Sequence, residues 1–330
     1  MIRLAVIGTN WITDKFIEAA LQTGQFELSA VYSRHEDSAK IFAQKYMLTT
    51  IFTSLEQLAK SPDIDAVYIA SPNSLHFEQA KLMLENGKDV ICEKPLTSNI
   101  EQTKILIKIA KQQQQIIFEA LKSYYLPNFE RVKQYLPKLG KIRKVCLNYC
   151  QYSSRYPLYL AGENPNTFNP AFSNGSVMDI GIYPLNFAIA LWGAPNGVSA
   201  DALRLPSGVD GHGTILMRYN DFDVVILHSK VSNSYLPSEI QGEEGALIID
   251  HLSVAEKVCY QPRDGELQNI TLAQNDNQMY YEALKFAELI KQRQINHMGL
   301  NNSLISSQLL TEIRQQTGII FPVDKFQSIS

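Results

Sequence analysis

A turn at residues 8–13 has the residue types that bind a phosphate group. An apolar run ends at Ile7, Gly8 follows, and a helical pattern begins at Ile12, so the turn joins a strand to a helix. At such a junction, glycine lets the backbone approach a pyrophosphate, and the free amides and dipole of the helix N-terminus stabilise its charge. Only the first of the fingerprint's three small positions is glycine, and Asn10 occupies the second, where we expect a positive φ. The turn predicts a dinucleotide site whose contacts are Gly8, Thr9, Asn10, Trp11 and Ile12.

A hydroxyl and a guanidinium follow the second predicted strand, at Ser33 and Arg34. NAD-binding chains usually carry an Asp or Glu at this point to bind the ribose hydroxyls, whereas the first acid here is Glu36. Arginine makes charge-assisted, bidentate contacts to phosphate oxygens, which suits the 2′-phosphate of NADP. The pair therefore favours NADP, with NAD possible. The alternative is a solvated loop arginine that contacts no ligand.

Later motifs, together with the turn, resemble those of a known family. Ala70–His76 (ASPNSLH) follows one predicted strand, and Cys92–Leu96 (CEKPL) follows the next. In this order the motifs resemble the nucleotide turn, the (T/S)PN..H segment and the Glu-Lys-Pro motif of the Gfo/Idh/MocA family of NAD(P)-dependent oxidoreductases. Gly175–Pro184 (GSVMDIGIYP) resembles the D-x-G-x-(H/Y) motif of the family's second domain. The last position of this motif is Tyr183, where many family members have His. In this the sequence resembles the branch of dihydrodiol dehydrogenases, xylose dehydrogenases and glucose-fructose oxidoreductase.

The resemblance implies an α/β protein of two domains. Residues 1–122 would form a dinucleotide-binding Rossmann domain with a doubly wound parallel sheet. Residues 123–330 would form a substrate-binding and dimerisation domain with an open, mostly antiparallel sheet, and the C-terminal helices would pack back toward the first domain. Family members commonly pair through the open face of that second sheet, so a homodimer or homotetramer is expected.

The resemblance also implies a reaction, the transfer of a hydride between a nicotinamide and a hydroxyl or carbonyl carbon of a sugar, polyol or related small molecule. Such a transfer needs a group that accepts or supplies the hydroxyl proton. Tyr183 is the candidate, because a nearby ammonium favours the phenolate, and Lys94 would supply that charge and stabilise the alkoxide. Asp179 lies four residues before Tyr183, so the two share a face if the segment is helical, and Asp179 would bind a hydroxyl or hold Lys94 in place. The implied cofactor contacts beyond the turn are Ser33, Arg34, Ser71, Pro72, Asn73, His76, Glu93 and Lys94.

Each of these residues also has a structural alternative. Lys94 fits an exposed turn lysine, Asp179 fits a helix N-cap, and Tyr183 fits a packed aromatic whose hydroxyl bonds to the backbone. His76 is expected on the nucleotide side or in a structural role rather than as a catalyst, and Trp11 either lies under the cofactor or packs the turn. For the whole chain, the alternative is a catalytically inactive nucleotide-binding regulator or sensor, which would need no proton-transfer pair.

Hydrophobic periodicity predicts the elements that must position these residues. The first third alternates short β-branched runs with longer amphipathic stretches, which is typical of βαβ units around a parallel sheet. The expected strands are 4–7, 28–32, 66–70, 89–92 and 115–119. The expected helices are 12–23, 38–46, 75–85 and 100–112.

After Ser123 the pattern changes to loops rich in Tyr and Asn, and then to alternating runs joined by tight turns. This pattern indicates an antiparallel sheet. The expected strands are 142–149, 214–219, 224–229, 238–241, 246–249 and 258–261. Two amphipathic helices, 277–292 and 304–317, are expected to cover one side of a sheet.

Composition excludes several other classes of protein. With 330 residues, of which 45% are hydrophobic and 19% charged, the chain can bury the cores of about two domains. The net charge of -3 provides no general attraction for nucleic acid or anionic lipid, and no recognition helix is evident. No apolar run approaches the roughly 18 residues of a membrane span. The four cysteines are scattered, complete no metal site with the histidines, and favour reduced, ordinarily packed thiols in a cytoplasm.

Overall fold

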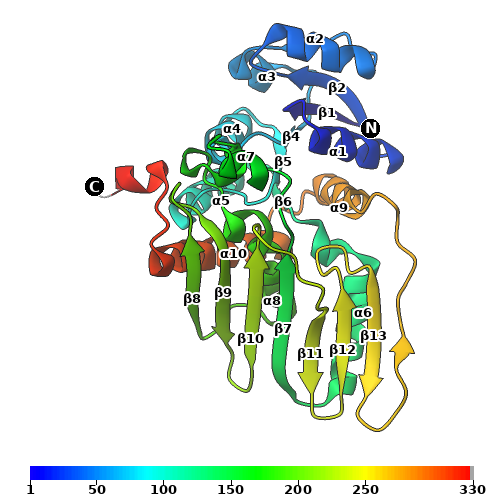
Figure 1. Cartoon of the computed structure of the whole chain (residues 1–330). Helices are drawn as coiled ribbons and strands as arrows, with labels where there is room; N and C mark the ends of the chain where they lie inside the picture. The colour runs from blue at the N-terminus through cyan, green and yellow to red at the C-terminus, as the bar shows by residue number, and fades with distance from the viewer. Residues whose placement is uncertain (328–330) are drawn as a thin grey trace. The chain divides into compact units, whose positions relative to one another are not determined.

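The computed structural model describes residues 1–327, which divide into two compact units (Figure 1). The first consists of Met1–Leu121 with Asn275–Leu304, and the second of Lys122–Gln274 with the residues from Ile305 onward. The first unit contains a parallel sheet and the second a mostly antiparallel sheet. The fold class expected from the sequence is therefore confirmed.

A six-stranded parallel sheet forms the centre of the first unit, in the order β3-β2-β1-β4-β5-β6. The strands are β1 (Ile2–Ile7), β2 (Phe26–Tyr32), β3 (Ile51–Phe52), β4 (Ala66–Ile69), β5 (Asp89–Glu93) and β6 (Ile117–Ala120). Sequence periodicity missed β3, because this edge strand is only two residues long. The strand order reverses beside β1, and at such a switch point the carboxyl ends of the strands form the crevice in which open α/β sheets bind ligands.

Helices pack against this sheet, and they are α1 (Trp11–Gln22), α2 (Glu36–Lys45), α3 (Leu55–Lys60), α4 (Asn73–Glu85), α5 (Ile100–Gln113) and α9 (Met279–Gln292). Hydrophobic periodicity did not predict α3, because this helix is only six residues long. α9 comes from far along the chain and packs on α1. Its Phe286 ring lies 6.2 Å from Phe26 and 5.7 Å from Phe118, between ring centroids. A late segment thus completes the core of the first unit.

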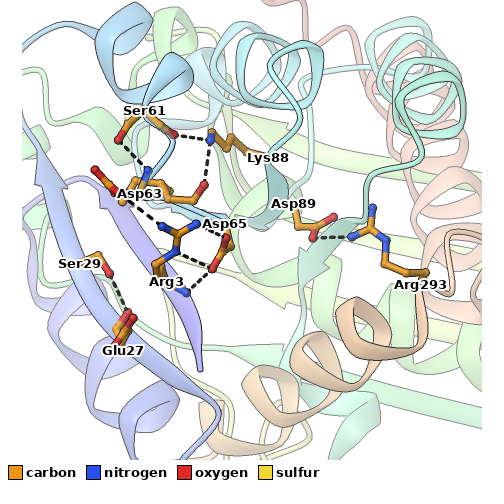
Figure 2. Close-up of polar contacts among 10 residues, drawn as sticks. Arg3, Glu27, Ser29, Ser61, Asp63, Asp65, Lys88, Asp89 and Arg293 are labelled. Carbon is orange, nitrogen blue, oxygen red and sulfur yellow. Dashed lines mark hydrogen bonds and ion pairs between the residues drawn. The ribbon is translucent and has the colours of Figure 1, made fainter.

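Charged side chains tie together the amino ends of the central strands, at the edge opposite the crevice (Figure 2). Arg3 of β1 donates from Nε and Nη2 to the Asp65 carboxylate, at 3.1 and 2.8 Å. The Lys88 ammonium donates to backbone carbonyls of the segment before β4. Asp89, at the start of β5, accepts from Arg293 Nη1 at 2.9 Å. Burial raises the pKa of Asp89, so the guanidinium helps to keep this carboxyl ionised.

The second unit contains an eight-stranded sheet in the order β14-β13-β12-β11-β7-β10-β9-β8. The strands are β7 (Ile142–Cys150), β8 (Gly197–Arg204), β9 (Asp210–Arg218), β10 (Asp223–Ser229), β11 (Ser238–Gly242), β12 (Gly245–Asp250), β13 (Lys257–Pro262) and β14 (Gln268–Asn269). Among the described strands of this sheet, only β7 and β10 pair in parallel, which agrees with a mostly antiparallel sheet. Periodicity did not predict β8, whose burial pattern alternates weakly, or the two-residue β14.

The two faces of this sheet differ in burial. Val145 and Ile226 are fully buried on the face that α6 (Pro127–Tyr135) and α8 (Ile182–Trp192) contact (Figure 1). On the opposite face the alternate side chains are more exposed, among them Cys146 and Leu227. Cys146 is therefore not packed as the sequence analysis expected. The remaining helices of the unit are the short α7 (Tyr156–Leu160) and the later part of α10 (Met298–Thr317).

Candidate active site

Gly8 shapes the turn between β1 and α1. Its φ is +112°, a conformation that side chains rarely adopt, and a Cβ built there would lie 2.9 Å from the carbonyl oxygen of Ala70. The turn therefore passes close to the end of β4 in a way that only glycine permits. This close packing places the start of α1 at the crevice, as a dinucleotide site requires.

Asn10 does not adopt the positive φ that we expected, since its φ is -98° and its ψ is 174°. It is instead the N-cap of α1, a position that favours Asn with an extended backbone. Its Oδ1 accepts from the amides of Ile12 and Thr13 at 3.0 and 3.3 Å, and its Nδ2 donates to Ala70 O at 3.0 Å. The side chain thus joins the turn to β4. Trp11 is 67% exposed, so it does not pack the turn.

Ser33 and Arg34 lie at the same edge of the sheet as the Gly8 turn, because Ile7 and Tyr32 are paired in the last register of β1 and β2. Ser33 is half-buried, and its amide donates to Phe52 O at 3.2 Å. Arg34 is exposed. A backbone-anchored hydroxyl beside an exposed guanidinium has the donors that a phosphate monoester needs.

His76 joins the loops that follow β4 and β5. The ring is fully buried, with Nδ1 2.9 Å from Pro95 O and Nε2 2.9 Å from Ser71 O. Burial lowers the pKa of this histidine, although the two carbonyls oppose the shift. Ser71 Oγ donates to Gln79 Oε1 at 2.7 Å, which also fixes the first loop. His76 therefore acts through the loops that it holds. The Lys94–Pro95 peptide, in the loop after β5, is cis.

Buried groups anchor both sides of Lys94, which is itself half-buried. Before it, Glu93 Oε1 accepts from the hydroxyl of Tyr68 at 2.7 Å. After it, the amide of Leu96 donates to Glu119 Oε1 at 2.8 Å. Burial raises the pKa of Glu119, and the hydrogen bond from Leu96 opposes that shift. These contacts hold the Glu-Lys-Pro loop at the carboxyl end of β5.

In the second unit, Asp179 and Tyr183 lie on one continuous helical segment, the condition under which their spacing puts them on one face. Asp179 belongs to a π-helical turn, η5 (Val177–Gly181), and Tyr183 to the first turn of α8. Such π-turns occur frequently at functional sites. Asp179 is inside the turn and not at its N-cap, which is Ser176. The Tyr183 ring meets the Tyr149 ring at a centroid distance of 5.6 Å and an angle of 61°.

Asp179 forms an ion pair with Lys230, a residue that the sequence analysis did not single out. Lys230 directly follows β10 and is 7% exposed, while the Asp179 side chain keeps 29% of its surface exposed. The pair spans 51 positions of sequence. A charged residue directly after a buried strand was the only signal in the sequence, and it is a weak one.

A buried polar cluster lies under the π-turn. Ser176 Oγ is 2.8 Å from His228 Nδ1, and Asp210 Oδ2 accepts from the amide of Val177 at 2.7 Å. Burial lowers the pKa of His228 to about 3 and raises that of Asp210 to about 6. Ser176 and Asp210 both face Nδ1 of the same ring, so the set lacks the relay through Nε2 that a hydrolase triad uses. The cluster instead fixes the backbone that carries Asp179.

Among residues 1–327, no group of three or more His, Cys, Asp or Glu side chains could hold a metal ion. Within the same residues, none of the helices combines the length and apolar character that a membrane crossing requires. The cysteines Cys92, Cys146, Cys150 and Cys259 are all free.

Comparison with known proteins agrees with the folds of both units. Residues 2–121 match the Gfo/Idh/MocA model described as an oxidoreductase family with an NAD-binding Rossmann fold, and residues 129–248 match the C-terminal domain of that family. The chain is 56% identical to an uncharacterized oxidoreductase, YgjR, of Escherichia coli K12, over 98% of this chain and 99% of the relative. It is 46% identical to scyllo-inositol 2-dehydrogenase (NADP(+)) IolU of Bacillus subtilis 168, over 98% of this chain and 100% of the relative.

Solved structures show the same fold at lower identity. KijD10, a 3-ketoreductase from Actinomadura kijaniata, superposes with a TM-score of 0.86 at 22% identity, covering 96% of this chain and 98% of that one. A levoglucosan dehydrogenase superposes with a TM-score of 0.86 at 18% identity, covering 96% and 97%. At such identities the likeness concerns the fold alone.

Proposed function

The chain belongs to the Gfo/Idh/MocA family of NAD(P)-dependent oxidoreductases, and we propose that it oxidises a secondary hydroxyl of a cyclic polyol or sugar with NADP. The observation that carries the proposal is the 46% identity to an NADP-dependent scyllo-inositol dehydrogenase along the whole of both chains. In the reaction, a CH–OH group would become a carbonyl, and a side chain of the protein would accept its hydroxyl proton while the bound cofactor would supply the acceptor for its hydride.

The cofactor is NADP, with NAD possible, and the first unit has groups that fit it. The Gly8 turn leaves room that a Cβ would fill, and the N-terminus of α1 suits a pyrophosphate. We propose Ser33 and Arg34 as the contacts of the 2′-phosphate, and His76 as a residue that holds the loops. The remaining proposed contacts are Thr9, Asn10, Trp11, Ile12, Ser71, Pro72, Asn73, Glu93 and Lys94. When bound, the nicotinamide supplies the hydride acceptor.

Three side chains of this protein would handle the proton and the charge. We propose that Tyr183 accepts the hydroxyl proton, with its ring held by Tyr149. The Lys94 ammonium would favour the phenolate and stabilise the developing alkoxide. Asp179, ionised and partly exposed, would accept a hydrogen bond from a substrate hydroxyl.

A direct assay tests the proposal. Purified protein is mixed with NADP⁺ or NAD⁺ and with scyllo-inositol, other inositols, aldoses or linear polyols, and NAD(P)H formation is followed by its absorbance. We expect turnover of at least one cyclic polyol with NADP⁺, and loss of that turnover in Lys94→Met. Tight NADP binding in calorimetry without turnover of any compound would instead indicate the inactive regulator or sensor.

We further propose that residues 123–330 mediate pairing with a second copy through the open face of their sheet, giving a homodimer or homotetramer. This face carries apolar side chains such as Leu227, 38% exposed, which water solvates poorly. Light scattering at micromolar concentration should report at least a dimer, and a monomer would contradict the proposal. Residues 1–122 would then form the cofactor domain of each copy. A cytoplasmic location is proposed because all four cysteines are free.

A further inference from the structure

Lys230 is a buried cation whose backbone is held on both sides. Its amide donates to Gly211 O at 2.8 Å, and its carbonyl accepts from the amide of Ser153 at 2.9 Å. Only 7% of the residue is exposed. A buried ammonium is costly unless a carboxylate compensates it, and Asp179 does so through an ion pair.

The Lys230 ammonium also acts on the buried carboxyl of Asp210. Burial raises the pKa of Asp210, and the positive charge of Lys230 opposes that shift. His228, in the same cluster, has a pKa of about 3 and is therefore neutral at pH 7. Lys230 thus compensates the charge of Asp179 through the ion pair, and it adds a smaller stabilising effect on Asp210 to that of the backbone hydrogen bonds there.

The exposures of the two partners differ, and the difference indicates their roles. The Lys230 side chain is 9% exposed and the Asp179 side chain 29%. The carboxylate is therefore accessible to a ligand, and the ammonium lies behind it. A carboxylate held in this way stays ionised and keeps one orientation, which a strong hydrogen-bond acceptor for a hydroxyl requires.

We propose that Lys230 is a positioning residue, which holds Asp179 ionised and oriented so that Asp179 can accept a hydrogen bond from a substrate hydroxyl. The proposal deepens the proposed function and rests on it, because it assumes that Asp179 contacts the substrate. The alternative is an ion pair that serves stability only.

The first test needs no substrate. Protein carrying ¹³C in its aspartate carboxyl groups is titrated by NMR, and the Asp179 signal is assigned by its loss in Asp179→Asn. Lys230 pairs directly with Asp179, and the elements packed around the π-turn also carry the titratable groups Asp210, His228, Tyr183 and Tyr149. Because an opposite charge at short range lowers a carboxyl pKa by about 1 to 3 units, we expect the pKa of Asp179 to lie below the ordinary value of about 3.9 in the wild type.

Variants at position 230 sharpen the titration. Lys230→Met keeps the length of the side chain and removes the charge, so the pKa of Asp179 should rise by about one unit or more. Lys230→Arg should restore most of the shift. Lys144→Met is the matched control, because Lys144 pairs with Asp223 on the same sheet at 3.4 Å in an exposed position. A wild-type pKa at or above the ordinary value would overturn the proposal even if Lys230→Met does not fold.

The second test measures catalysis with a polyol that the wild type oxidises. In Lys230→Met the acidic limb of the kcat/KM profile should move to higher pH, in step with the Asp179 titration. NADP affinity measured by calorimetry should stay within about twofold, and Lys230→Arg should restore the wild-type profile. An unchanged limb together with a lower Tm would assign the pair to stability alone. If the wild type oxidises no polyol, the proposed function fails, and the titration still decides whether Lys230 holds Asp179 ionised.

Discussion

The imidazole of His76 places Nδ1 2.9 Å from the carbonyl oxygen of Pro95, in a position without solvent exposure. Its other nitrogen is equally close to Ser71 O, in the loop after β4. Burial lowers the pKa of the ring, and a neutral imidazole has one N–H, so it can donate to only one of these carbonyls. Even so, a single side chain contacts both the loop after β4, which includes Ser71, and the loop after β5, which includes Lys94.

His76→Ala should therefore weaken both loops. Carbonyl groups buried without a donor cost about 1 to 3 kcal/mol each, so we expect urea unfolding to show a loss of about 2 kcal/mol. NADP affinity should fall as well, because the loops lose their common anchor. Glu78→Ala, at an exposed position of the same helix, is the control and should change neither quantity. An unaffected NADP affinity in His76→Ala would show that the loops keep their geometry without the ring.

Gly8→Ala should impair cofactor binding. At a φ of +112° a side chain is strained, and the added Cβ would meet Ala70 O at 2.9 Å, so a cost of about 1 to 3 kcal/mol is expected. Gly24→Ala is the matched control, because Gly24 has a φ of +66° but no atom within 4 Å of an added Cβ. Both variants should lose stability in thermal unfolding. Only Gly8→Ala should lose NADP affinity in calorimetric titration.

Arg34→Ala should weaken NADP binding and spare NAD binding. A charge-assisted contact to phosphate contributes about 1.5 to 3 kcal/mol, which corresponds to roughly 10- to 150-fold in Kd. Calorimetry with both cofactors measures the two affinities, and Arg143→Ala, at an exposed arginine of β7, controls for the change in net charge. Equal losses of affinity for NADP and NAD would show that Arg34 does not contact the 2′-phosphate.

Lys94 and Tyr183 should behave as a coupled pair. Tyr183→Phe keeps the ring packing against Tyr149 and removes the hydroxyl, so turnover should fall by about 10² to 10⁴, as for the loss of general acid-base catalysis. Lys94→Met should cost at least as much. The double variant should be scarcely slower than the worse single variant, whereas independent groups would multiply their losses. Should Tyr183→Phe retain about a third of the turnover, the proton would have to pass through another group.

The buried His228 predicts a pH dependence of stability. The pKa of His228 is about 3 in the folded chain and about 6.5 when unfolded. Below about pH 6.5 the unfolded chain therefore binds an extra proton, and the free energy of unfolding decreases as the pH is lowered. Asp210, with a folded pKa of about 6, acts in the opposite sense between about pH 4 and 6, because there the folded chain binds the extra proton. In the wild type these two contributions oppose each other.

The variant His228→Gln should reveal the contribution of His228 to the pH dependence of stability. The free energy of unfolding of His228→Gln, measured in urea titrations, should increase relative to that of the wild type by about 1.4 kcal/mol for each unit by which the pH is lowered from 6 to 4. Ser176→Ala removes the hydrogen bond to the ring without removing the titrating group, so its loss of stability should be similar at each pH. A constant difference between His228→Gln and the wild type would contradict the lowered pKa.

Local sequence determined much of the protein before any contact was known. Hydrophobic periodicity identified five of the six strands of the first sheet, because buried strands in a parallel sheet are continuous apolar runs. It also identified the helices that carry strong amphipathic patterns. The order of the glycine turn, the Glu-Lys-Pro motif and the segment around Asp179 indicated the family. Each of these signals lies within a few neighbouring residues, where propensity and spacing act directly.

The tertiary structure alone decided how those residues are held. Lys230 meets Asp179 across 51 positions because η5 lies against the end of β10, and no local pattern encodes that approach. The N-cap role of Asn10 is local, but its side chain reaches Ala70 only because β4 pairs beside β1. His76 spans two loops for the same reason, since β4 and β5 end at one edge of the sheet. Such contacts depend on strand order and register, which are properties of the whole sheet and not of any segment within it.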